Sequence, residues 1–316
     1  MEKKGKHMKE VLVVYYSQTG QLLDILENMV SPLKQDNITV SYYRIVPEEP
    51  YEFPWQKEKF FDCFPESFLQ IPSRFHPPEE EILKKKYDLV ILGYQVWYLT
   101  PSIPINSFLR SDIGKSLLKG RPVLTVVACR NMWIQAQEKM KRLLAKIEAK
   151  LVGHIALVDR HINHISVITI SHWMLSGRKD RYLGIFPKPG ISDKDIREAN
   201  KFGEPIKTAL LVGDFSNLQQ TLLKQGAIHV NPYLVLTDKR GNVLFSKWAS
   251  HIIKKGGPGE PRRLKWIRIF NYYLLFAIWV IAPIVFIVFL LTYLPRYQRM
   301  KEEKAYYSSV ALKENK

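Results

Sequence analysis

Five short segments rich in apolar and β-branched residues alternate with helical patterns, and this alternation limits the fold more than any other feature of the chain. The segments are residues 11–16, 38–46, 87–93, 122–128 and 152–158. Apolar runs of this length are typical of strands buried on both faces, and the helices between them supply the crossovers of a parallel sheet. We therefore expect an α/β fold with a doubly wound, five-stranded parallel sheet.

Helical patterns follow the strands at residues 21–33, 105–110, 133–150 and 192–212. Ser192 is a suitable N-cap for the last of these, and Asp193 and Asp195 stand in its first turn.

The first strand ends abruptly in a turn of small and polar residues, which is followed directly by a helix. The turn consists of Ser17, Gln18, Thr19, Gly20 and Gln21. Unpaired backbone N–H groups and the positive end of the helix dipole favour an anion at such a place. A tight turn with a good N-cap is the alternative reading of this turn alone.

Two further loops follow the third and fourth strands. Residues 94–104 include Gln95, Val96, Trp97 and Tyr98, and residues 128–133 include Cys129, Arg130 and Asn131. Ligands of open α/β sheets bind at the carboxyl ends of the strands, where all three loops lie. The sequence therefore predicts one shared ligand site.

These three loops resemble those of the flavodoxin-like flavoprotein family over residues 10–212. The resemblance implies a sheet of strand order 2-1-3-4-5 that binds FMN. It also implies that residues 17–21 hold the 5′-phosphate, that Trp97 or Tyr98 lies against the isoalloxazine ring, and that the backbone near Arg130 and Asn131 approaches the pyrimidine edge. Leu22 departs from the family pattern, because Thr or Ser often ends the phosphate loop there.

Two aromatic stretches interrupt the pattern between residues 48 and 78, namely Glu-Pro-Tyr-Glu-Phe-Pro-Trp and Phe-Phe-Asp-Cys-Phe-Pro-Glu-Ser. Together with the first loop they resemble the aromatase family of bacterial dialkylresorcinol (flexirubin-type) biosynthesis. That resemblance implies oxidative aromatisation of a 2,5-dialkylcyclohexane-1,3-dione to a dialkylresorcinol, with FMN as hydride acceptor. A lipophilic substrate and a ketosynthase of the same pathway are the partners it implies.

A second insertion, residues 159–190, contains His161 and His164. Histidine titrates near neutral pH, so either could act as the general base of a dehydrogenation. No acidic or cysteine ligand completes a metal set, and we expect no metal. Histidines at the rim of an interfacial segment are the alternative.

The net charge of +17 would suit nucleic acid or an anionic membrane, but much of the excess flanks a C-terminal apolar run and no nucleic-acid-binding motif occurs. Residues 270–294 carry no formal charge and are long enough to cross a bilayer of about 30 Å. Pro283 near their middle leaves two topologies open, a single span or a re-entrant hairpin.

The remaining segments complete the expected organisation. Residues 1–9 form a basic tail, 213–253 an extension with a β-hairpin that turns near 239–242, 254–269 a basic linker, and 295–316 a polar tail. The N-terminus lacks the apolar core of a secretory signal. We therefore expect a flavin domain in the cytoplasm, anchored to the bacterial inner membrane.

The sequence thus favours a membrane-associated, FMN-dependent oxidoreductase of the dehydrogenase or aromatase type. Two alternatives stay open. One is an NAD(P)H-dependent quinone reductase, and the other is a degenerate flavodoxin-like scaffold without catalysis.

Overall fold

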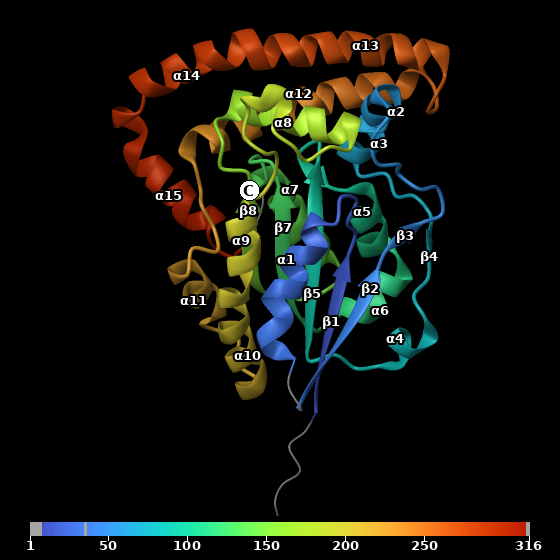
Figure 1. The fold of residues 1–316 in the computed structure, drawn as a ribbon, viewed down its shortest axis with the longest axis vertical. Helices are drawn as coiled ribbons and strands as arrows, with labels where there is room; N and C mark the ends of the chain where they lie inside the picture. The colour runs from blue at the N-terminus through green and yellow to red at the C-terminus, as the bar shows by residue number, and fades with distance from the viewer. Residues whose placement is uncertain (1–7, 35–36, 314–316) are drawn as a thin grey trace, which may run out of the picture.

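The computed structural model describes residues 8–34 and 37–313. Its centre is a parallel sheet of five long strands in the order β2-β1-β5-β7-β8. The strands are β1 (Lys9–Tyr15), β2 (Ile38–Arg44), β5 (Leu89–Trp97), β7 (Pro122–Cys129) and β8 (Lys150–Val158). The predicted α/β class and the order 2-1-3-4-5 are confirmed, and Figure 1 shows helices on both faces of this sheet.

Successive side chains of each strand enter two different cores, which is why the strands read as unbroken apolar runs. In β1, Leu12 and Val14 belong to one core, whereas Val11 and Val13 belong to the other. All four are fully buried. Burial of apolar surface on both faces stabilises this arrangement by about 25 cal/mol for each Å² removed from water.

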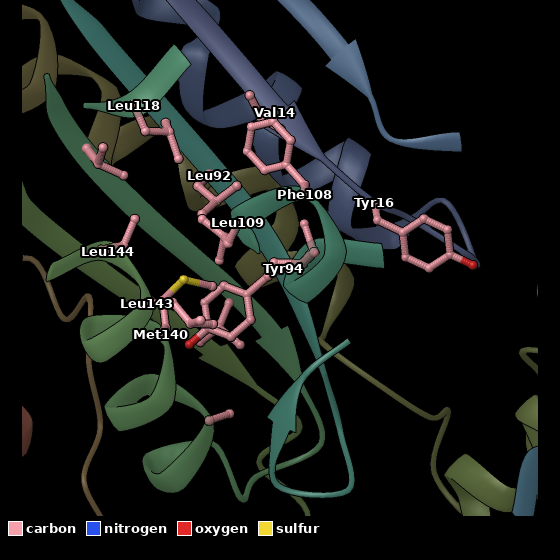
Figure 2. Packing of buried hydrophobic residues seen from close by; sticks show 14 of the residues in the cluster. Val14, Tyr16, Leu92, Tyr94, Phe108, Leu109, Leu118, Met140, Leu143 and Leu144 are labelled. Carbon is pink, nitrogen blue, oxygen red and sulfur yellow. The ribbon is translucent and has the colours of Figure 1, made fainter. Parts of the chain in front are cut away.

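Three helices cover the first face of the sheet: α5 (Ile103–Arg110), α6 (Asp112–Leu118) and α7 (Ile134–Lys146). Figure 2 shows Phe108 and Leu109 of α5 and Met140 of α7 among the strand residues Leu92 and Tyr94. The phenol of Tyr94 is buried there and donates to Gln137 Oε1 at 2.7 Å.

The second face is covered by α1 (Gln21–Val30) and by a helical run near the end of the α/β core. That run consists of α9 (Asp193–Arg197), the 3₁₀ turn Glu198–Phe202, α10 (Gly203–Val212) and α11 (Leu218–Lys224). The helix predicted at 192–212 is therefore divided into three pieces. Its predicted N-cap is confirmed, since Ser192 Oγ accepts from the Asp195 N–H at 3.0 Å.

The aromatic insertion folds into two short helices, α2 (Lys57–Asp62) and α3 (Phe64–Leu69), between the small strands β3 (Val46–Pro47) and β4 (Phe75–His76). The short helix α4 (Glu80–Lys84) precedes β5, and β6 (Thr100–Pro101) pairs back on β5. The second insertion forms α8 (Asn163–Ser176), followed by the 3₁₀ turn Tyr182–Gly184.

The predicted hairpin within 213–253 is wrong, because residues 232–252 form one helix, α12 (Pro232–Ile252). Asn231 caps it by accepting from the N–H groups of Tyr233 and Leu234, and Pro232 stands at the favoured first position. The sequence Lys-Arg-Gly-Asn is typical of a turn, but Gly241 remains helical. A Cβ there would lie 3.2 Å from Leu99 Cδ1, so this glycine permits close packing on the loop after β5.

The predicted linker at 254–269 is correct only in its first part and wrong from Pro261 onward. After the 3₁₀ turn Ile253–Lys255, the helix α13 (Pro261–Phe276) begins and continues through the π-helical turn Ala277–Ile281 into α14 (Ala282–Leu291). The backbone stays helical across Pro283, so the re-entrant hairpin is wrong as well.

The segment 295–316, expected as a tail, contains a 3₁₀ turn (Leu294–Arg296) and α15 (Tyr297–Tyr307), which returns to the domain. Of the tail predicted at 1–9, residues 1–7 lie outside the described part of the chain, as do 314–316. Figure 1 shows α13 and α14 running across the carboxyl end of the sheet, above α12 and α8.

Candidate functional site at the carboxyl edge of the sheet

Strand pairing brings the three predicted loops to one edge of the sheet. β1 and β7 both pair with β5, in registers that place Tyr15 beside Gly93 and Gln95 beside Ala128. The loops that follow these strands therefore leave the sheet side by side. Rings from the first two loops touch, since Tyr16 and Trp97 have centroids 5.9 Å apart.

The first loop ends at a helix start that no side chain caps. Gly20 is the N-cap of α1 at φ 85°, a conformation that glycine adopts without steric cost, and no side chain bonds to the first turn of the helix. The Oγ of Ser17 is buried and has no hydrogen-bond partner among the described residues. Backbone donors and a buried hydroxyl thus lie together, and Thr19 lies partly exposed between them.

The two glutamines of this loop are held by other segments. Gln18 Oε1 accepts from the Trp55 indole at 3.0 Å, and its amide donates to the Tyr51 carbonyl at 3.2 Å. Gln21 bonds to both the N–H and the carbonyl of Ile191. Leu22 is 1% exposed in the core beneath the sheet, because the second residue of α1 faces the strands.

The second loop is tightly turned. Tyr98 and Leu99 both have positive φ, at 50° and 63°, where β6 folds back on β5. Non-glycine residues in this region store strain that surrounding contacts must hold. Gln95 and Val96 are half-buried, and Gln95 Oε1 has no hydrogen-bond partner among the described residues.

The two aromatic residues predicted to stack on a flavin lie in different surroundings. Trp97 is 9% exposed, and its ring meets Tyr51 and Trp55 edge-on at 4.9 and 5.4 Å between centroids. Tyr98 packs on Phe64, and its hydroxyl donates to the Phe60 carbonyl at 2.5 Å. The aromatic insertion therefore encloses the second loop, and the stacking role stays a prediction.

The third loop is fixed by the start of α8. Asn163 Oδ1 accepts from Arg130 Nη1 at 2.7 Å and from Asn131 Nδ2 at 3.1 Å. Burial lowers the pKa of Arg130, although its guanidinium keeps its charge at any ordinary pH. Asn131 Oδ1 is buried and has no partner among the described residues. Burial raises the pKa of the neighbouring Cys129 thiol, which argues against a thiolate nucleophile.

Each of the three loops therefore carries a buried polar oxygen without a partner among the described residues: Ser17 Oγ in the first, Gln95 Oε1 and Ser102 Oγ in the second, and Asn131 Oδ1 in the third. Most buried polar groups in proteins are hydrogen-bonded, so these exceptions on adjacent loops need an explanation. A ligand that extends along this edge, with an anionic group at α1 and polar ring atoms toward β7, would satisfy them. The residues present fit such a ligand.

The two histidines of the second insertion have separate environments. His161 Nδ1 lies 2.6 Å from Oδ1 of Asp159, and Asp159 is 1% exposed and also accepts from Ser166. His164 Nε2 instead bonds to the Ile278 carbonyl of the apolar helix at 3.0 Å. No group of three or more His, Cys, Asp or Glu side chains suited to a metal occurs among the residues described.

Sequence reasoning missed Asp238, which α12 places behind the third loop. Its Oδ2 accepts from the Gln135 N–H at 3.3 Å and so caps α7, which has no cap of its own. Burial raises the pKa of Asp238 to about 7 and lowers that of the nearby Lys139 to about 8. No local signal marks this aspartate, because its partners belong to a helix about 100 residues earlier.

A cavity of about 420 Å³ lies elsewhere, on the outer side of α1. It is lined by Asp24, Glu27, Asn28, Lys179, Asp193, Ile196 and Arg197. None of the predicted site residues is among them, so this cavity belongs to a different part of the molecule.

Comparison with known proteins gave matches to solved structures alone. No protein-family model and no curated protein sequence matches the chain. One similar structure is a candidate flavoprotein from Bacteroides eggerthii DSM 20697, with 19% identity, 53% of this chain and 98% of that chain covered, and a TM-score of 0.37. Another is a flavoprotein in complex with FMN from Lactobacillus acidophilus NCFM, with 18% identity, coverage of 47% and 93%, and a TM-score of 0.37.

Proposed function

We propose that the protein binds FMN at the carboxyl edge of its sheet and is a flavin-dependent oxidoreductase. The observation that carries this proposal is the set of buried oxygens without partners among the described residues, at least one on each of three adjacent loops, beside an uncapped helix start. FMN combines one phosphate with a ring that carries several hydrogen-bonding atoms. It therefore matches both parts of the edge.

The site residues fall into two groups, one for the phosphate of FMN and one for its ring. Ser17, Thr19 and the backbone at Gly20 and Gln21 would hold the phosphate at the start of α1, where the helix dipole favours negative charge. Gln95, Asn131 and the fixed charge of Arg130 would lie toward the ring. The flavin, when bound, supplies hydride acceptance, and the protein supplies position and electrostatics.

We propose oxidative aromatisation of a dialkylcyclohexanedione to a dialkylresorcinol as the reaction. The substrate must lose a proton as well as a hydride, and a general base has to take the proton. We assign this role to His161, because the buried Asp159 orients its ring, whereas His164 Nε2 is committed to a backbone carbonyl. A carboxylate that bonds to one ring nitrogen fixes the tautomer in which the other nitrogen is basic.

The proposed substrate is lipophilic, and two features of the chain support this. The aromatic insertion adds Tyr51, Trp55 and Phe60 beside the loops, and a long apolar helix crosses the same edge of the sheet. We place the protein at the bacterial inner membrane with its flavin domain in the cytoplasm. A ketosynthase of the same pathway is the partner proposed to deliver the substrate.

A turnover assay tests this function. The detergent-solubilised protein is supplied with FMN, a 2,5-dialkylcyclohexane-1,3-dione and an electron acceptor, and resorcinol is followed by mass spectrometry. We expect one resorcinol formed for each two electrons passed to the acceptor. Turnover of NADPH with a quinone, without resorcinol formation, would instead identify a quinone reductase, and binding of FMN without either reaction would contradict the enzymatic proposal.

A further inference from the structure

The apolar helix at the C-terminal side is tied to the domain at both of its ends and at its middle. It comprises α13, the π-helical turn and α14, from Pro261 to Leu291, and we call it the edge helix. It has 31 residues and is the one helix, among the residues described, long and apolar enough to cross a membrane. At about 1.5 Å per residue it is about 46 Å long.

The beginning of the edge helix is held by a buried ion cluster. Arg263 is fully buried, and its guanidinium bonds to Asp62 Oδ1 at 2.7 Å and to Glu66 Oε2 at 2.6 Å. Two helical turns later, Phe270 stacks on Phe64 with ring centroids 4.0 Å apart. Separation of this end from the domain would leave two carboxylates and a guanidinium without partners.

The middle of the edge helix is held at a backbone carbonyl that has no hydrogen-bond donor within the helix. In the π-helical turn the Ala282 N–H bonds to the Ala277 carbonyl, so the next carbonyl, of Ile278, would pair with residue 283. That residue is Pro283, which has no N–H. His164 Nε2 bonds to the Ile278 carbonyl instead, and the Tyr233 hydroxyl donates to the Ala282 carbonyl at 2.9 Å. A helix surrounded by lipid would leave the Ile278 carbonyl unpaired.

The far end returns to the same domain through α15. Lys239 pairs with Glu303 at 2.9 Å, Tyr306 donates to Glu138 Oε2 at 2.6 Å, and Tyr307 is 7% exposed in the core. A helix that crossed the bilayer would place α15 about 30 Å away, on the opposite side. All of these contacts would then be lost.

The edge helix exposes apolar side chains along its length, around most of its circumference in α14, and has basic residues near its ends. Only 11% of its most apolar 18-residue window is buried. The exposed apolar residues include Tyr272, Leu275, Phe276, Trp279, Val280, Ile281, Ile284, Phe286, Ile287, Val288, Leu290 and Leu291. The exposed cations near the two ends are Arg262, Lys265, Arg268, Arg296, Arg299, Lys301 and Lys304. Apolar surface with a basic border matches one leaflet of an anionic bilayer.

We propose that the edge helix lies in the plane of the membrane, within one leaflet, and does not span it. This inference deepens the proposed membrane association. In this orientation the carboxyl edge of the sheet faces the lipid. Helix α8 lies between the edge helix and the third loop, because its Asn163 bonds to Arg130 and its His164 bonds to the Ile278 carbonyl. A lipophilic substrate reaches the loops from the leaflet, beside α8.

Cysteine labelling from one side of the membrane tests this topology. Arg262→Cys and Lys301→Cys mark the two ends, and Lys115→Cys marks the exposed surface of α6. Each full-length variant is treated with a membrane-impermeant maleimide in sealed spheroplasts and in inverted vesicles, against the wild-type background of the two native cysteines, Cys63 and Cys129. We expect all three positions to react from the same face.

Reaction of Lys301→Cys from the face opposite to Arg262→Cys would establish a spanning helix and overturn the proposal. The proposal would also be overturned if the wild-type protein failed to float with vesicles of phosphatidylcholine and phosphatidylglycerol, whether the protein is monomeric or self-associated. None of these measurements needs flavin. A colourless protein that labels as expected would therefore contradict the proposed function and leave the topology standing.

The basic border provides a second, independent arm. Replacement of Arg262, Lys265 and Arg268 by Gln should weaken partition into phosphatidylglycerol vesicles about tenfold or more, because each surface cation contributes to attraction by anionic lipid. The matched control replaces Lys115, Lys146 and Lys224, three exposed lysines of the α/β core. Equal losses in the two triple variants would contradict the orientation.

Discussion

Gly20 is the residue on which the first loop depends, because it adopts a φ of 85° at the start of α1, where no side chain caps the helix. A Cβ at this position would meet no atom within 4 Å, so a substitution acts through backbone strain and not through a clash. The cost of a left-handed conformation for a β-branched residue is about 1–2 kcal/mol. This makes Gly20 a clean position at which to test the loop.

We predict that Gly20→Val lowers the affinity for FMN at least tenfold, as measured by quenching of flavin fluorescence on titration. Gly213→Val is the matched control, since Gly213 has φ of 76°, equally open surroundings and a place at the far end of α10. Both variants should lose similar stability, but only Gly20→Val should lose flavin. Equal FMN affinity in the two variants would show that the phosphate lies elsewhere.

The Asp159–His161 pair makes a second residue-scale prediction, which depends on the proposed reaction. His161→Gln should lower kcat about 100-fold or more, because general base catalysis contributes that much. His172→Gln is the control, as His172 has a similar carboxylate partner, Asp180 Oδ1 at 2.8 Å, away from the third loop. If kcat falls equally in both variants, His161 has no specific role in the reaction.

The raised pKa of Asp238 predicts how the stability of the protein changes with pH. Its pKa of about 7 in the folded protein exceeds the ordinary value of about 3.9, so the folded state holds the proton more tightly. Its contribution to the free energy of unfolding is therefore complete below pH 4 and decreases as the pH rises to 7, by up to about 1.4 kcal/mol per pH unit.

Asp238→Asn should consequently be more stable than the wild type at pH 8 and no more stable at pH 4, as measured by urea unfolding in detergent. The Asn side chain keeps an oxygen for the Gln135 N–H. Asp112→Asn, at an exposed carboxylate, is the control and should show no gain at pH 8. A stability difference for Asp238→Asn that does not vary with pH would contradict the raised pKa.

At the scale of elements, the strands and their order followed from the sequence because burial on both faces leaves an unbroken apolar run. Leu89 and Ile91 face one core, and Val90 and Leu92 face the other, so residues 89–92 of β5 are all apolar. The loops followed as well, since parallel strands end at a common edge. For the strands and loops, the residue pattern in the sequence and the environment in the fold therefore agree.

The C-terminal elements could not be predicted in the same way, because distant residues decide them. Arg263 belongs to a basic run that is typical of a solvated segment, yet it is buried and pairs with Asp62 and Glu66, about 200 residues earlier. Gly241 reads as a turn residue, but its contact with Leu99 depends on the tight turn after β5. Ser17, Gln95 and Asn131 were predicted as site residues, but their missing partners became visible only in the fold.

The Arg263 cluster gives a prediction for α13. Arg263→Met should lower the free energy of unfolding by about 3–5 kcal/mol, because it removes the guanidinium that pairs with the carboxylates of the buried Asp62 and the partly buried Glu66. Arg262→Met, at the exposed neighbouring position, should leave stability within error of the wild type. Addition of Asp62→Asn and Glu66→Gln to Arg263→Met should recover part of the loss, and no recovery would indicate that packing rather than charge causes it.

For the molecule as a whole, one end of the sheet carries every feature proposed to act. The three loops, α8 with its Asp-His pair and the edge helix all lie at the carboxyl end of the strands, while the opposite end holds the turns that connect helices to strands (Figure 1). The two cores beneath serve to hold this end in place. A flavin site next to a lipid-facing helix would unite these features.

Flavin content tests the central claim most directly. The full-length protein is purified in mild detergent, its absorbance spectrum is recorded, and acid-released flavin is identified and counted per chain. We predict a yellow protein, or one that turns yellow with added FMN, with about one FMN and no FAD for each chain. A colourless protein that takes up no FMN at concentrations that saturate flavoproteins would contradict the account.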